Sequence, residues 1–90
     1  MTHWSFSNNY GKVKRLNPHR PGTSFRLVDG ETAMNPTDGY YFVPAEHGNY
    51  AALIDLLYMA AERRYTIYVR TEENLAGDGS AVVMYLVVDW

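Results

Sequence analysis

The chain has 90 residues, 47% of them hydrophobic and 14% aromatic, and this length excludes a multi-domain enzyme because two separate cores would each be too small to offset their ordering entropy. It contains no cysteine, which excludes disulfides and thiolate-bound metals. Ten acidic against eight basic residues give a net charge of −2, which provides no general attraction to nucleic acid or to an anionic membrane. We expect one domain over residues 1–90, with residues 1–9 as an amino-terminal arm.

Basic residues gather near the amino terminus. Residues 1–28 hold five basic and no acidic residues, whereas residues 29–90 hold three basic and all ten acidic residues. Such asymmetry marks either a binding face or two segments that pair with each other, within one subunit or between subunits. We favour the pairing of the two segments, because blocks of like charge are usually solvated faces.

Three short strands are predicted in the first half of the chain, between closely spaced turn signals. Asn-Pro, Pro-Gly and Asp-Gly dipeptides predict five chain reversals between residues 17 and 39, the first of them at Asn17-Pro18. Residues 10–16, 23–28 and 40–43 have the alternating or β-branched and aromatic pattern of strands. Residues 31–34 follow a good hairpin turn but resemble a strand poorly, so strand and loop stay open there.

One strong helix is predicted from Tyr50 to Arg64, a segment rich in Ala, Leu and Met without Gly or Pro, with Asn49 as its cap. Its core-facing residues, at helical spacing, are Tyr50, Leu53, Ile54, Leu57 and Ala61. Leu56, Ala60 and Tyr58 widen the apolar side to about 200°, which is more than a small sheet needs. We interpret this helix as packed on its own sheet on one side and partly covered by a neighbouring subunit on the other.

Two further strands are predicted after the helix. Residues 65–71 alternate, with Ile67 and Val69 inward, whereas residues 81–90 follow a turn at 76–80 and are apolar without alternation. An unbroken apolar strand is usually covered on both faces, and in a chain with one helix the second cover most simply comes from another subunit.

The predicted order of three strands, one helix and two strands is that of the five-stranded oligonucleotide/oligosaccharide-binding barrel, the OB fold. Residues Gly48 to Ala61, followed by Tyr65 to Val69, resemble the corresponding part of the small B subunits of pentameric bacterial toxins. The resemblance implies a mainly β fold with one helix, a five-stranded OB-like barrel of order β-β-β-α-β-β. It also implies assembly into a ring, most simply of five subunits, in which the helices pack side by side around a pore. No sugar-contacting residue is carried over, and the cysteine pair usual in secreted members is missing.

Nothing in the sequence predicts catalysis, a metal site or a cofactor. The three histidines lack the spacing of metal ligands, and the serines lack a nucleophile motif. Asp55 and Glu62 lie two helical turns apart, about 10 Å along the axis, too far for an acid–base pair. Gly77-Asp78-Gly79 precedes a strand, whereas a phosphate-binding glycine loop precedes a helix. We therefore expect a non-enzymatic protein.

The leading prediction is a ring-forming binding or scaffold module with a carbohydrate or a protein as its partner. Repetition of a weak site around a ring raises avidity without improving any single contact. We expect the helix and the last strand to provide the oligomer interface, through Leu56, Met59, Ala60, Glu62, Arg63, Val83, Tyr85 and Val87.

The alternative is a protein that binds single-stranded nucleic acid. Aromatic rings close to positive charges are how OB barrels hold single strands, and both residue types are frequent near the amino terminus. The residues predicted for this role are Trp4, Phe6, Tyr10, Lys12, Lys14, Arg15 and Arg26. The acidic net charge makes this the weaker of the two hypotheses.

The cellular location is predicted from what residues 1–9 lack. They have neither the basic start nor the apolar run of a secretory signal, and no apolar run in the chain approaches the roughly 20 residues of a membrane span. We expect a cytoplasmic protein.

Overall fold

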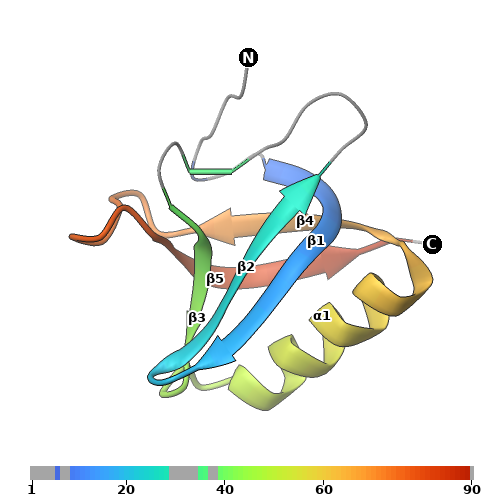
Figure 1. Ribbon diagram of the computed structural model, residues 1–90, viewed down its shortest axis with the longest axis horizontal. Coiled ribbons are helices and arrows are strands. Elements are labelled where there is room, and N and C mark those ends of the chain that lie inside the picture. Colours follow the sequence, from blue (N-terminus) through green and yellow to red (C-terminus); the bar gives the residue numbers. More distant parts are fainter. Residues whose placement is uncertain (1–5, 7–8, 29–34, 37–38, 90) are drawn as a thin grey trace.

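The computed structural model describes residues 6, 9–28, 35–36 and 39–89 (Figure 1). The elements are β1 (Asn9–His19), β2 (Gly22–Val28), β3 (Tyr41–Pro44), α1 (Tyr50–Arg63), β4 (Thr66–Thr71) and β5 (Ala81–Val88). The five strands form a closed barrel in the order β1-β2-β3-β5-β4, in which β3 and β5 are parallel and all other neighbours antiparallel. The prediction of a mainly β fold with one helix is confirmed. Residues 31–34, where strand or loop was left open, lie outside the described residues.

Strand β1 is the longest strand and pairs with two neighbours in succession. Its first part, Asn9 to Lys12, pairs with β4, and the part from Lys12 to His19 pairs with β2. The register with β2 shifts between Val13 and Arg15, so Lys14 is an extra residue in β1. A bulge of this kind bends and twists a strand, which helps β1 to take part in two sides of the barrel.

The predicted reversal at Asn17-Pro18 is wrong. Both residues continue the ladder, opposite Ser24 and Thr23, and the chain reverses at Arg20-Pro21, whose peptide bond is cis. Among the described strands, this end of β1 has only β2 as a neighbour. Pro18 is therefore tolerated, because an edge position can lack a backbone N–H without breaking a ladder.

Helix α1 lies against the barrel beside β1, β3 and β5 (Figure 1). Its buried side chains are Leu53, Leu57 and Ala60, and Tyr50, Ile54 and Ala61 pack against the same core more loosely. The apolar stripe predicted from the sequence therefore faces the barrel.

Asn49 is the N-cap of the helix, as predicted, but its side chain makes no capping hydrogen bond. Its carbonyl accepts from the backbone N–H of Leu53 at 2.9 Å. The backbone N–H of Asn49 donates to Nδ1 of His47 at 3.0 Å. The backbone N–H of His47 donates to the Pro44 carbonyl, and the N–H of Tyr50 donates to the His47 carbonyl. The turn at His47-Gly48 thus directs the chain into the helix.

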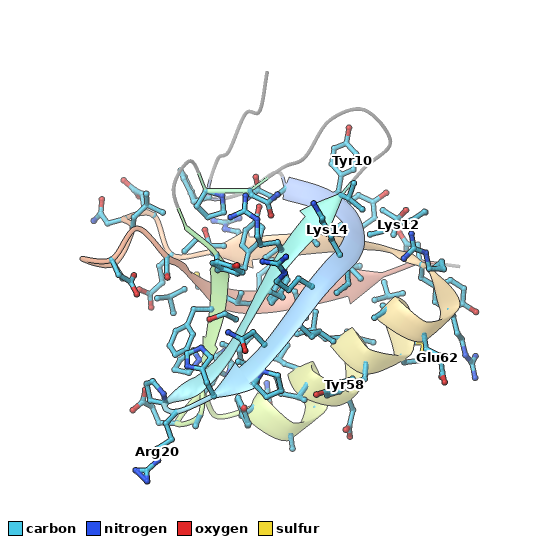
Figure 2. The ribbon with its side chains drawn as sticks, viewed as in Figure 1. Tyr10, Lys12, Lys14, Arg20, Tyr58 and Glu62 are labelled. Atoms are coloured by element: carbon cyan, nitrogen blue, oxygen red, sulfur yellow. The ribbon has the colours of Figure 1, made fainter. Side chains whose placement is uncertain are left out.

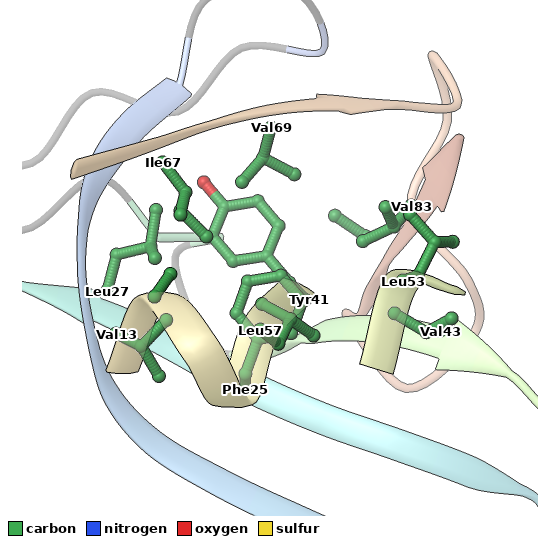
Figure 3. Packing of buried hydrophobic residues seen from close by; sticks show 12 residues of the cluster. Val13, Phe25, Leu27, Tyr41, Val43, Leu53, Leu57, Ile67, Val69 and Val83 are labelled. Carbon is green, nitrogen blue, oxygen red and sulfur yellow. The ribbon is translucent and has the colours of Figure 1, made fainter. Parts of the chain in front are cut away.

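The core of the barrel is formed by alternate side chains of the strands, joined by Leu53 and Leu57 of α1 (Figure 3). The rings of Phe25 and Tyr41 stack at its centre, with centroids 5.2 Å apart. Burial raises the pKa of the Tyr41 hydroxyl far above its ordinary value, so this side chain is uncharged in the folded protein.

Strand β5 has one inward and one outward face within the chain. Ala81 and Val83 are buried, whereas Met84, Tyr85 and Val87 are exposed by 49%, 50% and 43%. The chain therefore covers one face of this strand and leaves large apolar side chains on the other.

One buried side chain extends the sheet beyond β3. The pairing of β2 with β3 ends at Phe25 opposite Tyr41. Two residues farther along β2, the backbone N–H of Leu27 donates to Oδ1 of Asn35 at 2.8 Å, and Nδ2 of Asn35 donates to the Leu27 carbonyl at 2.9 Å. The Asn35 amide thus makes both hydrogen bonds that a neighbouring strand would make.

We expect Asn35→Ala to lower the free energy of unfolding by about 2–4 kcal/mol, because both backbone groups of Leu27 would be buried without a partner. Urea denaturation followed by circular dichroism measures this loss. Asn74→Ala, at an exposed position of the β4–β5 loop, is the control and should change stability by less than about 0.5 kcal/mol. Equal losses in the two variants would contradict the role assigned to Asn35.

Candidate functional site

A pocket of about 390 Å³ opens on the outside of the barrel, between the β1–β2 turn and the β4–β5 loop. Its floor comes from three adjacent strands, because Ser24 of β2 pairs with Phe42 of β3, and Phe42 pairs with Val82 of β5. One wall comes from the β1–β2 turn, and the other from residues 76–78 and 80. The volume lies within the range of small-molecule sites.

His19 forms the wall on the side of the β1–β2 turn. Its Nδ1 lies 2.8 Å from the carbonyl oxygen of Arg20, and its Nε2 lies 2.8 Å from Oγ of Ser24. A ring nitrogen next to a carbonyl must donate, so in the neutral ring Nε2 accepts the hydroxyl proton of Ser24. The ring also lies 5.9 Å from that of Phe42, at 35°. These contacts orient His19 and leave the lone pairs of the Ser24 oxygen for a ligand.

The β4–β5 loop closes into a hydrogen-bonded turn at the opposite wall. Oδ1 of Asp78 accepts from the backbone N–H of Ser80 at 2.9 Å, and backbone hydrogen bonds join Ala76 to Ser80 and Gly79 to Ala76. The hydrogen bonds from the backbone and side chain of Ser80 hold the pKa of Asp78 below its ordinary value. Asp78 therefore provides a carboxylate at neutral pH.

Close backbone packing fixes this loop against β3. The backbone of Gly39 contacts that of Gly79 so closely that no Cβ would fit at residue 39. Next to this contact, the backbone N–H of Ala81 donates to the Tyr40 carbonyl at 2.9 Å, and Nη1 of Arg26 donates to the Gly39 carbonyl at 2.6 Å. The position of Asp78 thus depends on a glycine pair and on the start of β5.

The lining of the pocket suits an uncharged polar ring. It combines the aromatic ring of Phe42 and aliphatic Val82 with the hydroxyl of Ser24 and the carboxylate of Asp78, and it contains neither lysine nor arginine. A ligand with C–H groups on one face can pack on Phe42 while its hydroxyl groups donate to Asp78. A phosphate group would be repelled by the same carboxylate.

A pair of arginines lies on the outer face of β1 and β2, one row of the sheet away from the pocket floor. Arg15 and Arg26 are cross-strand partners, and both contact Tyr40. Nη1 of Arg15 donates to the Tyr40 hydroxyl at 3.0 Å, and the Arg26 guanidinium lies 5.1 Å from the centre of the Tyr40 ring. Two cations and an aromatic ring therefore adjoin Phe42.

The residues predicted to bind nucleic acid do not form one surface. Arg15 and Arg26 lie beside the pocket, and Lys14 is exposed at the bulge of β1, whereas Trp4 lies outside the described residues. The other three lie along β4: Arg70 covers the ring of Phe6 at 5.3 Å, Tyr10 contacts Tyr68, and Nζ of Lys12 donates to Thr66. Figure 2 shows Tyr10, Lys12 and Lys14 at the opposite end of β1 from Arg20.

Six of the eight predicted interface residues keep accessible side chains. Leu56 and Met59 are half-buried, and Glu62, Arg63, Tyr85 and Val87 are exposed. Figure 2 shows Glu62 on the outer side of α1, together with Tyr58.

Ala60 and Val83 were predicted at the interface wrongly, since their exposed fractions are 0% and 1%. Ala60 lies on the same helical stripe as Leu53 and Leu57 and completes the core. The register of β4 and β5 shifts between Arg70 and Thr71, which places Val83 opposite Thr71 and turns it inward.

Sequence reasoning missed the pocket itself. Its residues come from the β1–β2 turn, β2, β3 and the end of the β4–β5 loop, which lie far apart in the chain. The local signals were the turn residues around Asp78 and the aromatic residue Phe42, and neither indicates a site without knowledge of the register.

The described part of the chain contains no group of three or more histidine, aspartate or glutamate side chains placed to bind a metal ion. Its one helix is too short to cross a membrane.

Gly22 allows a close approach of β2 to β3 next to the pocket floor. A Cβ at residue 22 would overlap the Val43 carbonyl oxygen and lie 2.9 Å from Cζ of Phe42. We expect Gly22→Ala to lower the free energy of unfolding by about 1–3 kcal/mol, because the overlap forces β2 and β3 apart. Gly48→Ala is the control, since no atom lies within 4 Å of its Cβ. Thermal denaturation of both variants measures this loss. An unchanged stability of Gly22→Ala would contradict the prediction, because it would show that β2 and β3 can move apart without destabilising the fold.

Comparison with known proteins gave no match to a protein-family model, to a curated protein or to a solved structure.

Proposed function

We propose that the chain is a non-enzymatic binding module with an OB-like barrel, whose pocket holds an uncharged polar ring compound of the size of a sugar unit. The position of the pocket carries this proposal. It lies on the outer face of β2 and β3, between the β1–β2 turn and the β4–β5 loop. This is the surface with which OB barrels bind oligosaccharides and oligonucleotides.

The chemistry of the lining favours a sugar over a nucleotide in the pocket. Phe42 offers a ring face, and Ser24 and Asp78 offer acceptors for hydroxyl groups. The nearest arginines already donate to Tyr40 and Gly39, outside the pocket lining. A neutral ligand gains a charge-assisted hydrogen bond from Asp78, whereas an anionic ligand meets repulsion.

The same lining argues for binding without hydrolysis. Glycoside hydrolysis uses a pair of carboxyl groups, one of them with a raised pKa so that it can donate a proton. Asp78 is the one carboxyl group in the pocket lining, and its pKa is lowered. His19 is held by Arg20 and Ser24 through both ring nitrogens.

We propose in addition that copies of the module assemble into a ring. The resemblance to toxin B subunits implies five subunits in this ring. A shallow pocket of this kind binds one sugar weakly, and repetition of the pocket would raise avidity for a ligand with many sugar units. The half-buried Leu56 and Met59 of α1 are available for such contacts.

We expect neutral monosaccharides to shift amide signals of residues 19, 20, 22–24, 42 and 76–82 in a ¹⁵N NMR titration, with Kd values in the millimolar range. Phe42→Ala and Asp78→Asn should each weaken binding by roughly ten-fold, because they remove the ring face and the charged acceptor. Leu75→Ala is the matched control, since Leu75 is exposed in the same loop but does not line the pocket.

The titration uses glucose, galactose, mannose and N-acetylglucosamine, with inorganic phosphate as an anionic probe. Equal weakening by Leu75→Ala would indicate a loop effect instead of a direct contact. Shifts confined to other surfaces, or phosphate bound more tightly than every sugar, would overturn the proposal.

A second candidate function, the binding of single-stranded nucleic acid, is favoured by one observation. Arg15, Arg26 and Tyr40 form a row beside Phe42 on the outer face of the barrel. Rings for base stacking beside cations for phosphates are the components of a single-strand site. This candidate uses two of the residues predicted from the sequence, Arg15 and Arg26, and replaces the predicted aromatic residues by Tyr40 and Phe42.

For this candidate we expect a fluorescein-labelled thymidine 15-mer to bind with an affinity that falls steeply with salt. Arg15→Gln should reduce the slope of log K against log salt by about 1, because one phosphate contact is lost. Arg63→Gln, an exposed arginine on α1, is the control and should leave the slope unchanged. Fluorescence anisotropy at several salt concentrations measures the slope, and the absence of binding at low salt would remove this candidate.

A further inference from the structure

Exposed large apolar side chains are concentrated on one side of the barrel. Among the described residues seven such side chains are exposed, and five of them belong to the adjacent strands β1, β4 and β5. The five, with their exposed fractions, are Tyr10 (38%), Tyr68 (44%), Met84 (49%), Tyr85 (50%) and Val87 (43%). We call this surface the tyrosine face.

The strand register makes the tyrosine face continuous. Tyr10 of β1 pairs with Tyr68 of β4, and Tyr68 pairs with Val87 of β5. The rings of Tyr10 and Tyr68 lie 5.9 Å apart, and Tyr85 sits two residues from Val87 on the same strand, opposite Arg70. Apolar residues scattered singly over a surface need no explanation, but a contiguous group marks an interaction site.

Charged residues lie on both sides of the uncharged row Tyr10, Tyr68 and Val87, with Arg70 directly opposite Tyr85. At one end, Lys12 of β1 pairs with Thr66 of β4. The next residue of β4, Ile67, pairs with Val88 of β5, and Asp89 follows Val88 in the chain. At the other end Arg70 and Glu72 flank the buried Thr71, so the alternation of β4 directs both outward. Each end therefore holds one cation and one anion.

This distribution of charge is self-complementary. When two copies stack face to face about a two-fold axis that lies across the strands, the two ends of the face exchange positions. Lys12 of one copy then meets Glu72 of the other across about one strand spacing of 4.8 Å, and Asp89 lies near Arg70 with a further offset of two residues, roughly 7 Å, along the strand. Long side chains cover such an offset, and like charges are not forced together.

We propose that the tyrosine face binds a second copy of this chain in a two-fold symmetric contact. The uncharged middle, with Tyr10, Tyr68 and Val87, is buried between the copies, and the charged ends set the orientation. Such a contact gives even numbers of subunits: two, or ten where rings of five pair face to face. The inference does not depend on what the pocket binds, since the pocket lies on the β2–β3 side of the barrel.

The central test places a charge in the middle of the contact. We expect the wild-type chain to sediment as an even-numbered species at concentrations of tens of micromolar, and Tyr68→Glu to weaken association by at least 100-fold. Tyr58→Glu is the matched control, because Tyr58 is exposed to a similar degree, 48% against 44%, but lies on α1. Circular dichroism checks that both variants keep the fold.

Three outcomes of sedimentation would overturn the proposal. They are a wild-type monomer at several hundred micromolar, a plain pentamer, and an association that Tyr68→Glu and Tyr58→Glu weaken equally. The sugar titration is repeated on Tyr68→Glu. An unchanged response of the pocket residues would show that sugar binding does not depend on the two-fold contact, so either proposal can fail without the other.

A charge exchange tests the orientation of the two copies. Lys12→Glu and Glu72→Lys should each weaken association by roughly ten-fold, and the double variant should restore it to within about three-fold of the wild type. Within one copy the two residues are separated by six residues of β4, roughly 20 Å, so they cannot pair there. Restoration therefore requires contact between copies, and a double variant as weak as the sum of the single variants would overturn the two-fold arrangement.

Discussion

The structure depends on a very short contact, the pairing of β3 with β5. These parallel strands share two residue pairs, Tyr41 with Ala81 and Phe42 with Val82, and this contact closes the barrel. It also brings the β4–β5 loop to the β1–β2 turn, and the pocket lies between these two segments. The backbone contact of Gly39 with Gly79 lies next to the closure and strengthens it. Without this closure all five strands would still be joined by four pairings in an open sheet, but the walls of the pocket would separate.

The core and the candidate site share one register. Successive residues of a strand point to opposite faces, so the pairing that buries Tyr41 against Phe25 also directs Phe42 and Ser24 outward. A shift of one residue in β3 would therefore lose the stacked rings of the core and the floor of the pocket together. Stability and the shape of the pocket cannot be changed independently at these positions.

Local patterns predicted the elements well, because their signals need no distant partner. The helix of α1 and the inward Ile67 and Val69 of β4 follow from periodicity alone. One error came from the tertiary structure: Pro18 stays in a strand because the edge of β1 is free at this point. The pocket could not be predicted, since its residues meet only through cross-strand pairs that no local pattern specifies.

The interface prediction for β5 likewise depended on tertiary structure at one residue, Val83. Simple alternation placed Val83, Tyr85 and Val87 on one face of the strand. Met84 is an extra residue opposite the step from Arg70 to Thr71, so Val83 is inward while Tyr85 and Val87 are outward. A bulge is decided by the partner strand, and the sequence of β5 contains no sign of it.

The bulge at Lys14 has a comparable effect on how β1 tolerates changes of length. The extra residue lets Lys12 and Arg15 both face outward while Val13 and Leu16 face the interior. Deleting Lys14 would therefore keep Arg15 outward and Leu16 inward, because Val13 and Arg15 already pair with the consecutive residues Leu27 and Arg26. Deleting a paired residue such as Leu16 would instead invert every later position of β1. A one-residue deletion at the bulge thus leaves the sides of the strand unchanged, as would a deletion in the exposed residues 73–75, whereas the same deletion at a paired position of β1 is equivalent to many substitutions.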